Sequence, residues 1–212
     1  MMDKNDTSAD YLVAQGRVQR FPRKEIELCI VKNFLNAAMC QQLVEMIDKN
    51  RHPSTIADPN GDNYFRTSET CDLDHSDSFV ANIDKQICTF SNIDHQFGEP
   101  LQGQRYAIGQ QFKAHTDYFN PGGQDFKKYC TISGQRTWTF MIYLNEPKAG
   151  GATRFTEFNK RFVPKTGMLL CWNNRRSNGT VNEWTLHHGM KVRVGTKYII
   201  TKWFRERPWP WS

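Results

Sequence analysis

The sequence lacks the features that mark membrane, secreted or disulfide-rich proteins. None of its apolar runs approaches the roughly 20 residues that a membrane-spanning helix needs. Its first residues lack the apolar core of a secretory signal. The six cysteines include no Cys-x-x-Cys pair and no spacing typical of a zinc or disulfide framework. We therefore expect a cytoplasmic protein with reduced thiols, in which residues 1–20 form a loose polar tail.

Internal repeats and low-complexity tracts are also absent, and 212 residues suit one domain with a substantial core. The net charge of +6 and the isoelectric point near 9.0 admit an acidic partner, and basic residues become denser after Lys191. No nucleic-acid recognition motif accompanies this charge. A solvated basic surface is therefore favoured over nucleic-acid binding.

The pattern along the chain predicts a mainly β core preceded by supporting elements. Residues 25–31 alternate as in a strand, and residues 36–50 have apolar side chains at helical spacing, with Asn36 as the candidate cap. Another helix is expected within residues 77–92. From Leu101 onward, short β-rich segments separated by Gly, Pro and Asn favour two packed sheets over an α/β fold. Residues 21–100 would then brace a core at residues 101–207.

Two His-x-Asp motifs occur, at His115–Asp117 and at His75–Asp77. Side chains at positions i and i+2 of a strand face the same side, so such a pair can reach one metal ion. His115 ends a strand-like run over residues 106–115. His75 instead lies in a polar stretch with turn chemistry, where residue 77 or 78 is expected to cap a helix. The first motif is therefore the candidate metal site.

A further ligand is expected from the adjacent residues His187 and His188, of which only one can face a metal on a strand. Two imidazoles and one carboxylate leave coordination positions open for oxygen and a cosubstrate. This ligand set suits non-haem Fe(II) oxygenases better than zinc or calcium chemistry. The pattern predicts an oxygenase.

Several segments together resemble prolyl 4-hydroxylase-type 2-oxoglutarate/Fe(II) oxygenases. The resemblance is strong from about Tyr106 to Arg207 and weaker upstream, through Arg66-Thr-Ser68. The matching segments, in family order, are Arg105–Phe119, Thr139–Asn145, Gly150–Phe155, Pro164–Gly167, Asn182–His187 and Gly195–Arg205.

The resemblance implies a double-stranded β-helix, or jelly roll, and a set of site residues. In that family the last metal ligand precedes the cosubstrate lysine by ten positions, which selects His187 and Lys197 and makes His188 a flanking residue. The implied Fe(II) ligands are His115, Asp117 and His187. The implied 2-oxoglutarate-binding residues are Lys197, Tyr106, Thr139 and Trp203, and the implied substrate-binding residues are Arg66, Ser68 and Arg205.

Lys197 suits its implied role on physical grounds. When 2-oxoglutarate chelates iron through its keto oxygen and C1 carboxylate, its distal carboxylate must be neutralised inside a largely apolar barrel. A buried ammonium group can do this as a charge-assisted donor. Alternation along the strand places residues 197, 199, 201 and 203 on one face, so Trp203 can share the interior surface with Lys197.

The resemblance implies oxidative decarboxylation of 2-oxoglutarate to succinate and carbon dioxide, coupled to hydroxylation of peptidyl proline at C4. It implies Fe(II), 2-oxoglutarate and oxygen, extends the cofactor set to ascorbate, and makes a peptide or protein the expected partner. Hydroxylation of another residue or of a free small molecule is the nearest alternative. A nucleic-acid demethylase is less expected, because such relatives usually anchor 2-oxoglutarate with arginine rather than lysine. A non-catalytic binding module is disfavoured because all four site residue types are intact.

Two features bear on substrate binding. Residues 54–64 and 118–136 are long for simple turns, which predicts either lids over the site or surface loops without substrate contact. Phe112 stands three positions before the first ligand, where related enzymes often have tyrosine. The missing hydroxyl removes any peptide hydrogen bond that tyrosine would make.

Overall fold

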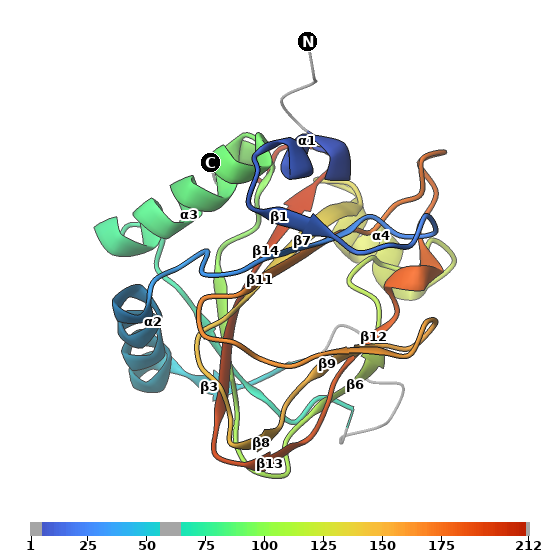
Figure 1. Ribbon diagram of the computed structural model, residues 1–212. Coiled ribbons are helices and arrows are strands. Elements are labelled where there is room, and N and C mark those ends of the chain that lie inside the picture. The colour runs from blue at the N-terminus through green and yellow to red at the C-terminus, as the bar shows by residue number, and fades with distance from the viewer. Residues whose placement is uncertain (1–5, 56–64, 211–212) are drawn as a thin grey trace.

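Two antiparallel sheets face each other in the computed structural model, which describes residues 6–55 and 65–210 (Figure 1). Side chains from both sheets fill the space between them. Met141 and Leu170 come from the larger sheet, and Phe155 and Phe162 come from the smaller one. This is the jelly-roll arrangement, so the predicted mainly β fold is confirmed.

Within the described residues, the larger sheet has eight strands in the order β1-β2-β11-β7-β14-β5-β4-β3. Neighbouring strands are antiparallel throughout. The strands are β1 (Val18–Arg20), β2 (Leu28–Val31), β3 (His52–Pro53), β4 (Glu69–Asp72), β5 (Gln102–Tyr106), β7 (Arg136–Tyr143), β11 (Leu169–Asn173) and β14 (Lys197–Arg205).

The smaller sheet has four described strands in the order β10-β9-β12-β6, and a two-stranded pair, β13-β8, lies at one end of the barrel (Figure 1). These strands are β6 (Phe112–His115), β8 (Ala149–Gly150), β9 (Thr153–Phe155), β10 (Lys160–Phe162), β12 (His187–Gly189) and β13 (Val192–Val194). The register pairs His187 of β12 with His115 of β6. Sheet pairing therefore brings together two residues that are 72 positions apart in the sequence.

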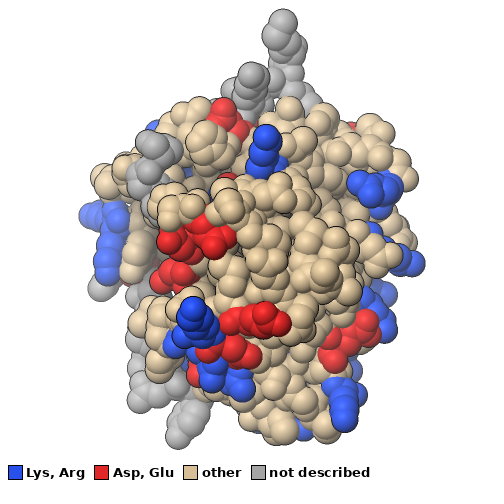
Figure 2. Space-filling view, turned by 90° about the vertical axis from the view of Figure 1, so that its left-hand side faces the viewer, with Lys and Arg blue, Asp and Glu red and all other residues tan. Residues whose placement is uncertain are grey.

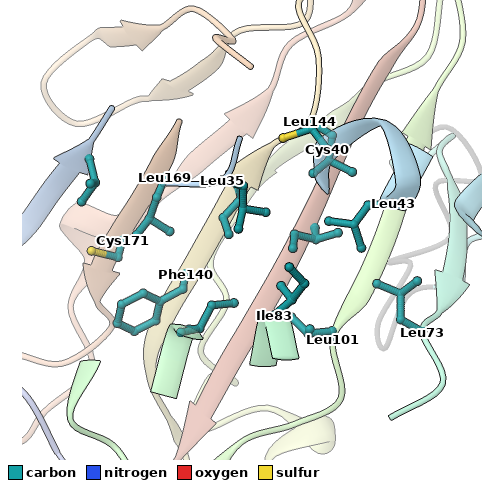
Figure 3. Packing of buried hydrophobic residues seen from close by; sticks show 14 of the residues in the cluster. Leu35, Cys40, Leu43, Leu73, Ile83, Leu101, Phe140, Leu144, Leu169 and Cys171 are labelled. Atoms are coloured by element: carbon teal, nitrogen blue, oxygen red, sulfur yellow. The ribbon is translucent and has the colours of Figure 1, made fainter. Parts of the chain in front are cut away.

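Helices α2 (Ala37–Asn50) and α3 (Ser78–Ser91) cover the outer face of the larger sheet (Figure 1). Their buried side chains join one apolar layer with the sheet, to which Leu43 of α2, Ile83 of α3 and Phe140 of β7 all belong (Figure 3). The remaining helical elements are α1 (Ala9–Ala14), α4 (Gln124–Cys130) and the 3₁₀ turns η1 (His95–Phe97) and η2 (Glu183–Thr185).

Side-chain caps begin both covering helices. Asn36 accepts a hydrogen bond from the backbone N–H of Met39 at 2.9 Å. Asp77 accepts from the N–H groups of Phe79 and Val80 at 2.8 and 3.1 Å. These contacts satisfy backbone donors that have no partner within the helix. The predicted helices are confirmed, and the second His-x-Asp motif contributes a cap, as the sequence indicated.

The structure corrects two local predictions. Residues 6–20 are not a loose tail: α1 buries Ala9 and Leu12, and β1 pairs with β2. The apolar side of α1 is too short to give a clear helical period. Residues 106–115 are not one strand either, because a turn at residues 107–111 separates β5 from β6. Gly109 adopts a φ of +85° there, which glycine tolerates without steric cost.

Charge is mixed on the side that carries α2 and α3. Acidic and basic side chains alternate over largely uncharged surface in this view, with no continuous basic area (Figure 2). Ion pairs join charged side chains at the C-terminal end of α2, including Arg51–Asp48 at 3.0 Å and Arg51–Glu69 at 3.2 Å. No helix within the described residues is long and apolar enough to cross a membrane.

Candidate metal and cosubstrate site

A cavity of about 610 Å³ opens between the two sheets. Alternate residues of β14 line it along the length of the strand: Lys197, Ile199, Thr201, Trp203 and Arg205. The period-2 alternation of a strand explains this pattern. The predicted shared face of residues 197 to 203 is therefore confirmed.

Three potential metal ligands converge in this cavity. His115 ends β6, Asp117 follows two residues later, and His187 begins β12 directly opposite His115. One ligand atom from each lies within 4.8 Å of the others, and Nε2 of His115 is 3.9 Å from Oδ1 of Asp117. Within the described chain, no other group of three such residues has this geometry. The sequence predicted this set.

Backbone contacts orient both imidazoles. Nδ1 of His115 lies 2.8 Å from the carbonyl oxygen of Lys113, and Nδ1 of His187 lies 2.9 Å from that of Thr185. A carbonyl can only accept, so each Nδ1 carries the hydrogen and each Nε2 keeps its lone pair for a metal. Burial, aided by the neighbouring His187, also lowers the pKa of His115 well below its ordinary value. The neutral, ligating form is thereby favoured.

Hydrogen bonding divides the roles of the two oxygens of Asp117. Oδ2 accepts from the hydroxyl of Thr139 at 2.7 Å, and that hydroxyl accepts from Nδ2 of Asn174 at 2.9 Å. Oδ1 is the oxygen that faces His115. Thr139 lines the cavity as expected, but its hydroxyl contacts the metal ligand, a contact that the sequence did not predict.

Aromatic rings pack against the imidazoles. The ring of Phe112 stacks on His115 with centroids 3.5 Å apart and an interplanar angle of 14°. Trp172 contacts His187 edge-on at 4.9 Å, and Phe155 lies 5.6 Å away. These contacts restrict rotation of the ligand side chains. Phe112, where the sequence departs from the family pattern, therefore supports a ligand in this protein.

Lys197 is a buried cation in the wall of the cavity. It is 1% exposed, and its Nζ lies 5.1 Å from the ring of Tyr106 and 5.4 Å from that of Tyr143. Burial lowers its pKa to about 7, and no carboxylate of the described residues opposes this effect. Tyr106 pairs with Lys197 in the β5–β14 register and donates its own hydroxyl to Gln104 at 2.8 Å. A carboxylate that entered here would supply the missing counter-ion.

The predicted substrate residues occupy three different environments. Arg66 lines the cavity and donates only to neutral groups among the described residues, including Ser68 at 3.0 Å and Thr70 at 3.1 Å. Ser68 is 3% exposed and lies behind Arg66 rather than on the cavity surface. The family resemblance implied that Arg205 binds substrate, but its side chain is buried and paired with Glu99 at 3.2 Å. Its long side chain turns toward this carboxylate, which the sequence did not associate with it.

Glu99, Arg136 and Arg205 form an ion-pair cluster that the sequence did not predict. Nε and Nη2 of Arg136 donate to the two oxygens of Glu99 at 2.6 and 2.8 Å. The guanidinium also lies 4.0 Å above the ring of Trp203 and donates to the backbone oxygen of Asp117 at 3.3 Å. Glu99 and Arg136 are 37 positions apart, so no short-range pattern could have revealed the pair. Asn174 and Trp172 also went unpredicted, since each resembles an ordinary strand residue.

Residues 118–136 form part of the cavity wall. Phe119 and Tyr129 of this segment stack with centroids 5.1 Å apart, and both line the cavity. The amide of Gln135 bonds to both backbone groups of Phe119, at 2.9 and 2.7 Å, and so closes the segment on itself. The segment therefore lies beside the site, where a lid would lie, and its contact with substrate stays a prediction. Most of the other predicted lid, residues 56–64, lies outside the described residues.

His188 points away from the metal ligands. Its Nε2 lies 3.4 Å from Oε1 of Gln111, and it belongs to no ligand group within the described chain. Burial and the nearby Arg154 lower its pKa. Neighbouring strand residues face opposite sides, so inward-facing His187 requires outward-facing His188.

Comparison with known proteins agrees with this site. Residues 101–205 match the family described as the 2OG-Fe(II) oxygenase superfamily. A putative prolyl 4-hydroxylase of Acanthamoeba polyphaga mimivirus is 30% identical over 179 residues, which cover 84% of this chain and 74% of the relative. The chain belongs to the prolyl 4-hydroxylase-type 2OG-Fe(II) oxygenases.

Further relatives of this family support the assignment. Probable prolyl 4-hydroxylase 9 of Arabidopsis thaliana is 28% identical over 198 residues, covering 82% of this chain and 67% of the relative. Among solved structures, the viral collagen prolyl hydroxylase of Paramecium Bursaria Chlorella virus-1, in its 2OG complex, aligns with a TM-score of 0.66 at 25% identity. The alignment covers 84% of this chain and 95% of that one.

The donor set of this oxygenase fits the metal that its family uses. Two imidazoles and one carboxylate form the 2-His-1-carboxylate set of non-haem Fe(II) enzymes. The family uses Fe(II), 2-oxoglutarate and oxygen. Its cosubstrate has two carboxylates, and Lys197 is a fully buried cavity cation that has no carboxylate partner among the described residues.

Proposed function

We propose that this oxygenase hydroxylates peptidyl proline at C4 while 2-oxoglutarate is converted to succinate and carbon dioxide. The observation that carries the proposal is the placement of three metal ligands and one isolated lysine in a single cavity of an enzyme related to prolyl 4-hydroxylases. The relatives named above support proline as the substrate, and the site residues support the oxygenase chemistry.

The chain's own residues would perform four tasks. His115, Asp117 and His187 would hold Fe(II), and Lys197 would neutralise the distal carboxylate of 2-oxoglutarate. With oxygen and 2-oxoglutarate, bound Fe(II) supplies the oxidant that inserts one oxygen atom into a C–H bond. The apolar rings around the ligands would exclude water from the reacting centre. The cavity wall would orient the target ring.

The mouth of the cavity suits an extended peptide. Arg66 carries N–H donors for peptide carbonyl groups, and Trp203, Phe119 and Tyr129 offer flat apolar surfaces for a pyrrolidine ring. A proline-rich peptide is already extended in solution, so its ordering costs little conformational entropy. These features support a peptide over a free amino acid, which would leave most of this surface uncovered.

The proposal includes a cellular setting. All six cysteines are free thiols, which supports a reducing, cytoplasmic location. The proposal also includes ascorbate, as a reductant that keeps the metal in the ferrous state. Only the family relationship supports that part.

The test is incubation of the enzyme with Fe(II), 2-oxoglutarate, oxygen and a panel of proline-containing peptides. Mass spectrometry should detect the gain of one oxygen atom, and amino-acid analysis should identify 4-hydroxyproline. Omission of 2-oxoglutarate and the His187→Ala variant serve as controls. Oxidation of a free amino acid, of another residue or of a methylated oligonucleotide, without any hydroxyproline, would retain the oxygenase chemistry and reject peptidyl proline as the substrate.

A further inference from the structure

Asn174 occupies a rigid and fully buried position behind the metal site. It follows β11 directly and has no exposed surface. Its backbone N–H donates to Thr137 at 2.7 Å, and its carbonyl accepts from Asn182 at 2.9 Å. Its side chain donates to Thr139, which in turn donates to Asp117. A side chain so fixed can impose a direction on the groups that it contacts.

The chemistry of the three groups fixes the direction of this chain of hydrogen bonds. The carboxylate of Asp117 can only accept, so the single hydroxyl hydrogen of Thr139 must point to Oδ2. The hydroxyl oxygen must then accept from its other neighbour. Asn174 therefore presents its NH₂ group to Thr139, and this settles which way round its amide lies.

This orientation leaves Oδ1 of Asn174 buried without a hydrogen-bond partner among the residues that the structure describes. An unsatisfied buried acceptor costs free energy that an apolar side chain of similar size would avoid. A residue suited only to packing would not carry this cost. The amide is useful here because it has a donor, and that donor acts on Thr139.

We propose that Asn174 is a positioning residue for Asp117. By donating to Thr139, it directs the hydroxyl hydrogen onto Oδ2 and leaves Oδ1 as the oxygen that binds the metal. A carboxylate held in this way cannot turn to bind through both oxygens and occupy a second coordination position. The position stays available to the cosubstrate and oxygen, which need the open sites of the triad. The inference rests on the proposed metal site and is independent of the substrate.

The first experiment measures Co(II) binding and the visible ligand-field spectrum of the full chain. Asn174→Asp keeps the size of the side chain but turns the donor into an acceptor that competes with Asp117 for the hydroxyl hydrogen. Its Co(II) affinity should fall by about 10- to 100-fold, the range typical of outer contacts to metal ligands. The spectrum should also change as Asp117 alters its binding mode. Wild-type affinity and spectrum in this variant would overturn the proposal.

Asn173→Ala is the matched control. Asn173 is the preceding residue, is also buried, and donates its amide to Glu27 at 2.8 Å, away from the metal. Its replacement should leave the Co(II) spectrum unchanged, even where it lowers the melting temperature. An equal spectral change in both variants would indicate a merely structural role for the region and would overturn the proposal.

A double-mutant cycle tests the route through Thr139. Asn174→Ala should weaken Co(II) binding in the wild-type background and have no further effect in Thr139→Val, because the hydroxyl through which it acts is gone. Thr139→Ser should restore the dependence on Asn174. Additive losses of Co(II) affinity in the double variant would overturn the proposal. This cycle tests the proposal even if the Asn174→Asp protein fails to fold.

Failure of the inference and failure of the proposed function give different results. Co(II) binding requires neither turnover nor peptide, so absence of proline hydroxylation leaves these measurements intact. Absence of Co(II) binding by the wild-type protein would overturn the metal site and the role of Asn174 together.

Discussion

The metal site and the ion-pair cluster of Glu99, Arg136 and Arg205 share one cavity but are held in place differently. The imidazoles of His115 and His187 depend on backbone carbonyls and stacked aromatic rings. The cluster depends on the attraction between one carboxylate and two guanidinium groups. Loss of one metal ligand should therefore remove function with little effect on folding. Loss of one charge in the cluster should instead destabilise the fold and have little effect on metal binding.

The strongest test of this comparison removes one metal ligand. His187→Ala should lose Fe(II) binding and activity, because the two remaining ligands are too few to hold the metal ion. The protein should stay folded, since the imidazole contacts mainly neighbouring rings and one backbone carbonyl. His188→Ala is the control, because that side chain faces outward toward Gln111. Iron content and circular dichroism check both variants, and retained iron in His187→Ala would show that the triad is assigned wrongly.

A second prediction concerns the cosubstrate end of the cavity. Lys197→Met should weaken 2-oxoglutarate binding by about 3–5 kcal/mol, since it leaves a buried carboxylate without a partner. Metal binding should persist, because no metal ligand contacts Lys197 in the described structure. Calorimetry with 2-oxoglutarate and a metal titration separate the two effects. Lys197→Arg is not a conservative control, because its planar head has a different shape. Unchanged cosubstrate affinity in Lys197→Met would reject this role.

The ion-pair cluster should show the opposite behaviour. Glu99→Gln leaves Arg136 and Arg205 buried without a carboxylate, at a cost of about 3–5 kcal/mol in the free energy of unfolding. Metal affinity of the folded protein should change little. Glu146→Gln breaks an exposed pair with Lys165 and should cost about 0–1 kcal/mol. Denaturant unfolding of both variants is the measurement. A stable Glu99→Gln protein that has lost metal binding would contradict the division drawn above.

Lys197 also predicts a pH dependence of stability. Its pKa is about 7 in the folded protein without cosubstrate and near 10.5 when exposed. The unfolded chain therefore holds more protons between these values, and folding becomes more favourable as pH rises through this window. The slope from this one group should reach roughly 1.4 kcal/mol per pH unit. Below pH 7 the full penalty of the buried charge applies.

The comparison with Lys197→Met isolates this effect from the other titrating groups. The wild-type protein should gain stability relative to the variant between pH 7.5 and 9, measured by denaturant unfolding at several pH values. 2-Oxoglutarate binding above pH 7 should also take up a proton, which calorimetry in buffers of different ionisation enthalpy detects. Parallel stability profiles for the two proteins would mean that Lys197 stays charged when its site is empty of cosubstrate.

The sequence predicted those parts of the molecule whose determinants are close together in the chain. The cap at Asn36 acts on a backbone N–H three residues away, and the shared face from Lys197 to Trp203 follows from strand alternation. The choice of His187 over His188 needed the family spacing, because alternation alone shows only that one of them faces inward.

The missed features depend on tertiary contacts between distant residues. Thr139 bonds to Asp117 across 22 positions, and Asn174 reaches Thr139 across 35. Arg205 turns inward because it donates a hydrogen bond to Glu99, which lies 106 positions earlier in the sequence. Nothing within a strand's own sequence specifies such a partner. Similarly, α1 is helical because Ala9 and Leu12 are buried by the rest of the core, which its short sequence cannot indicate.

The last prediction concerns Arg66 and separates peptide binding from the chemistry at the metal. Arg66 has only neutral partners among the described residues, and one N–H of its Nη1 group has no acceptor among them and can donate to a peptide. Arg66→Ala should weaken peptide use by about 1.5–3 kcal/mol, the usual contribution of hydrogen bonds to a charged group. Turnover of 2-oxoglutarate without peptide should change less, since Arg66 is not a metal ligand.

Arg105→Gln is the matched control, because Arg105 pairs with Glu69 and does not line the cavity. Succinate formation is measured for each variant with and without a proline-containing peptide. A peptide-specific loss in Arg66→Ala alone would place the peptide at this side of the cavity mouth. Equal losses with and without peptide would instead mean that Arg66 supports the metal site through Phe112, whose ring lies 4.9 Å from its guanidinium carbon and stacks on His115.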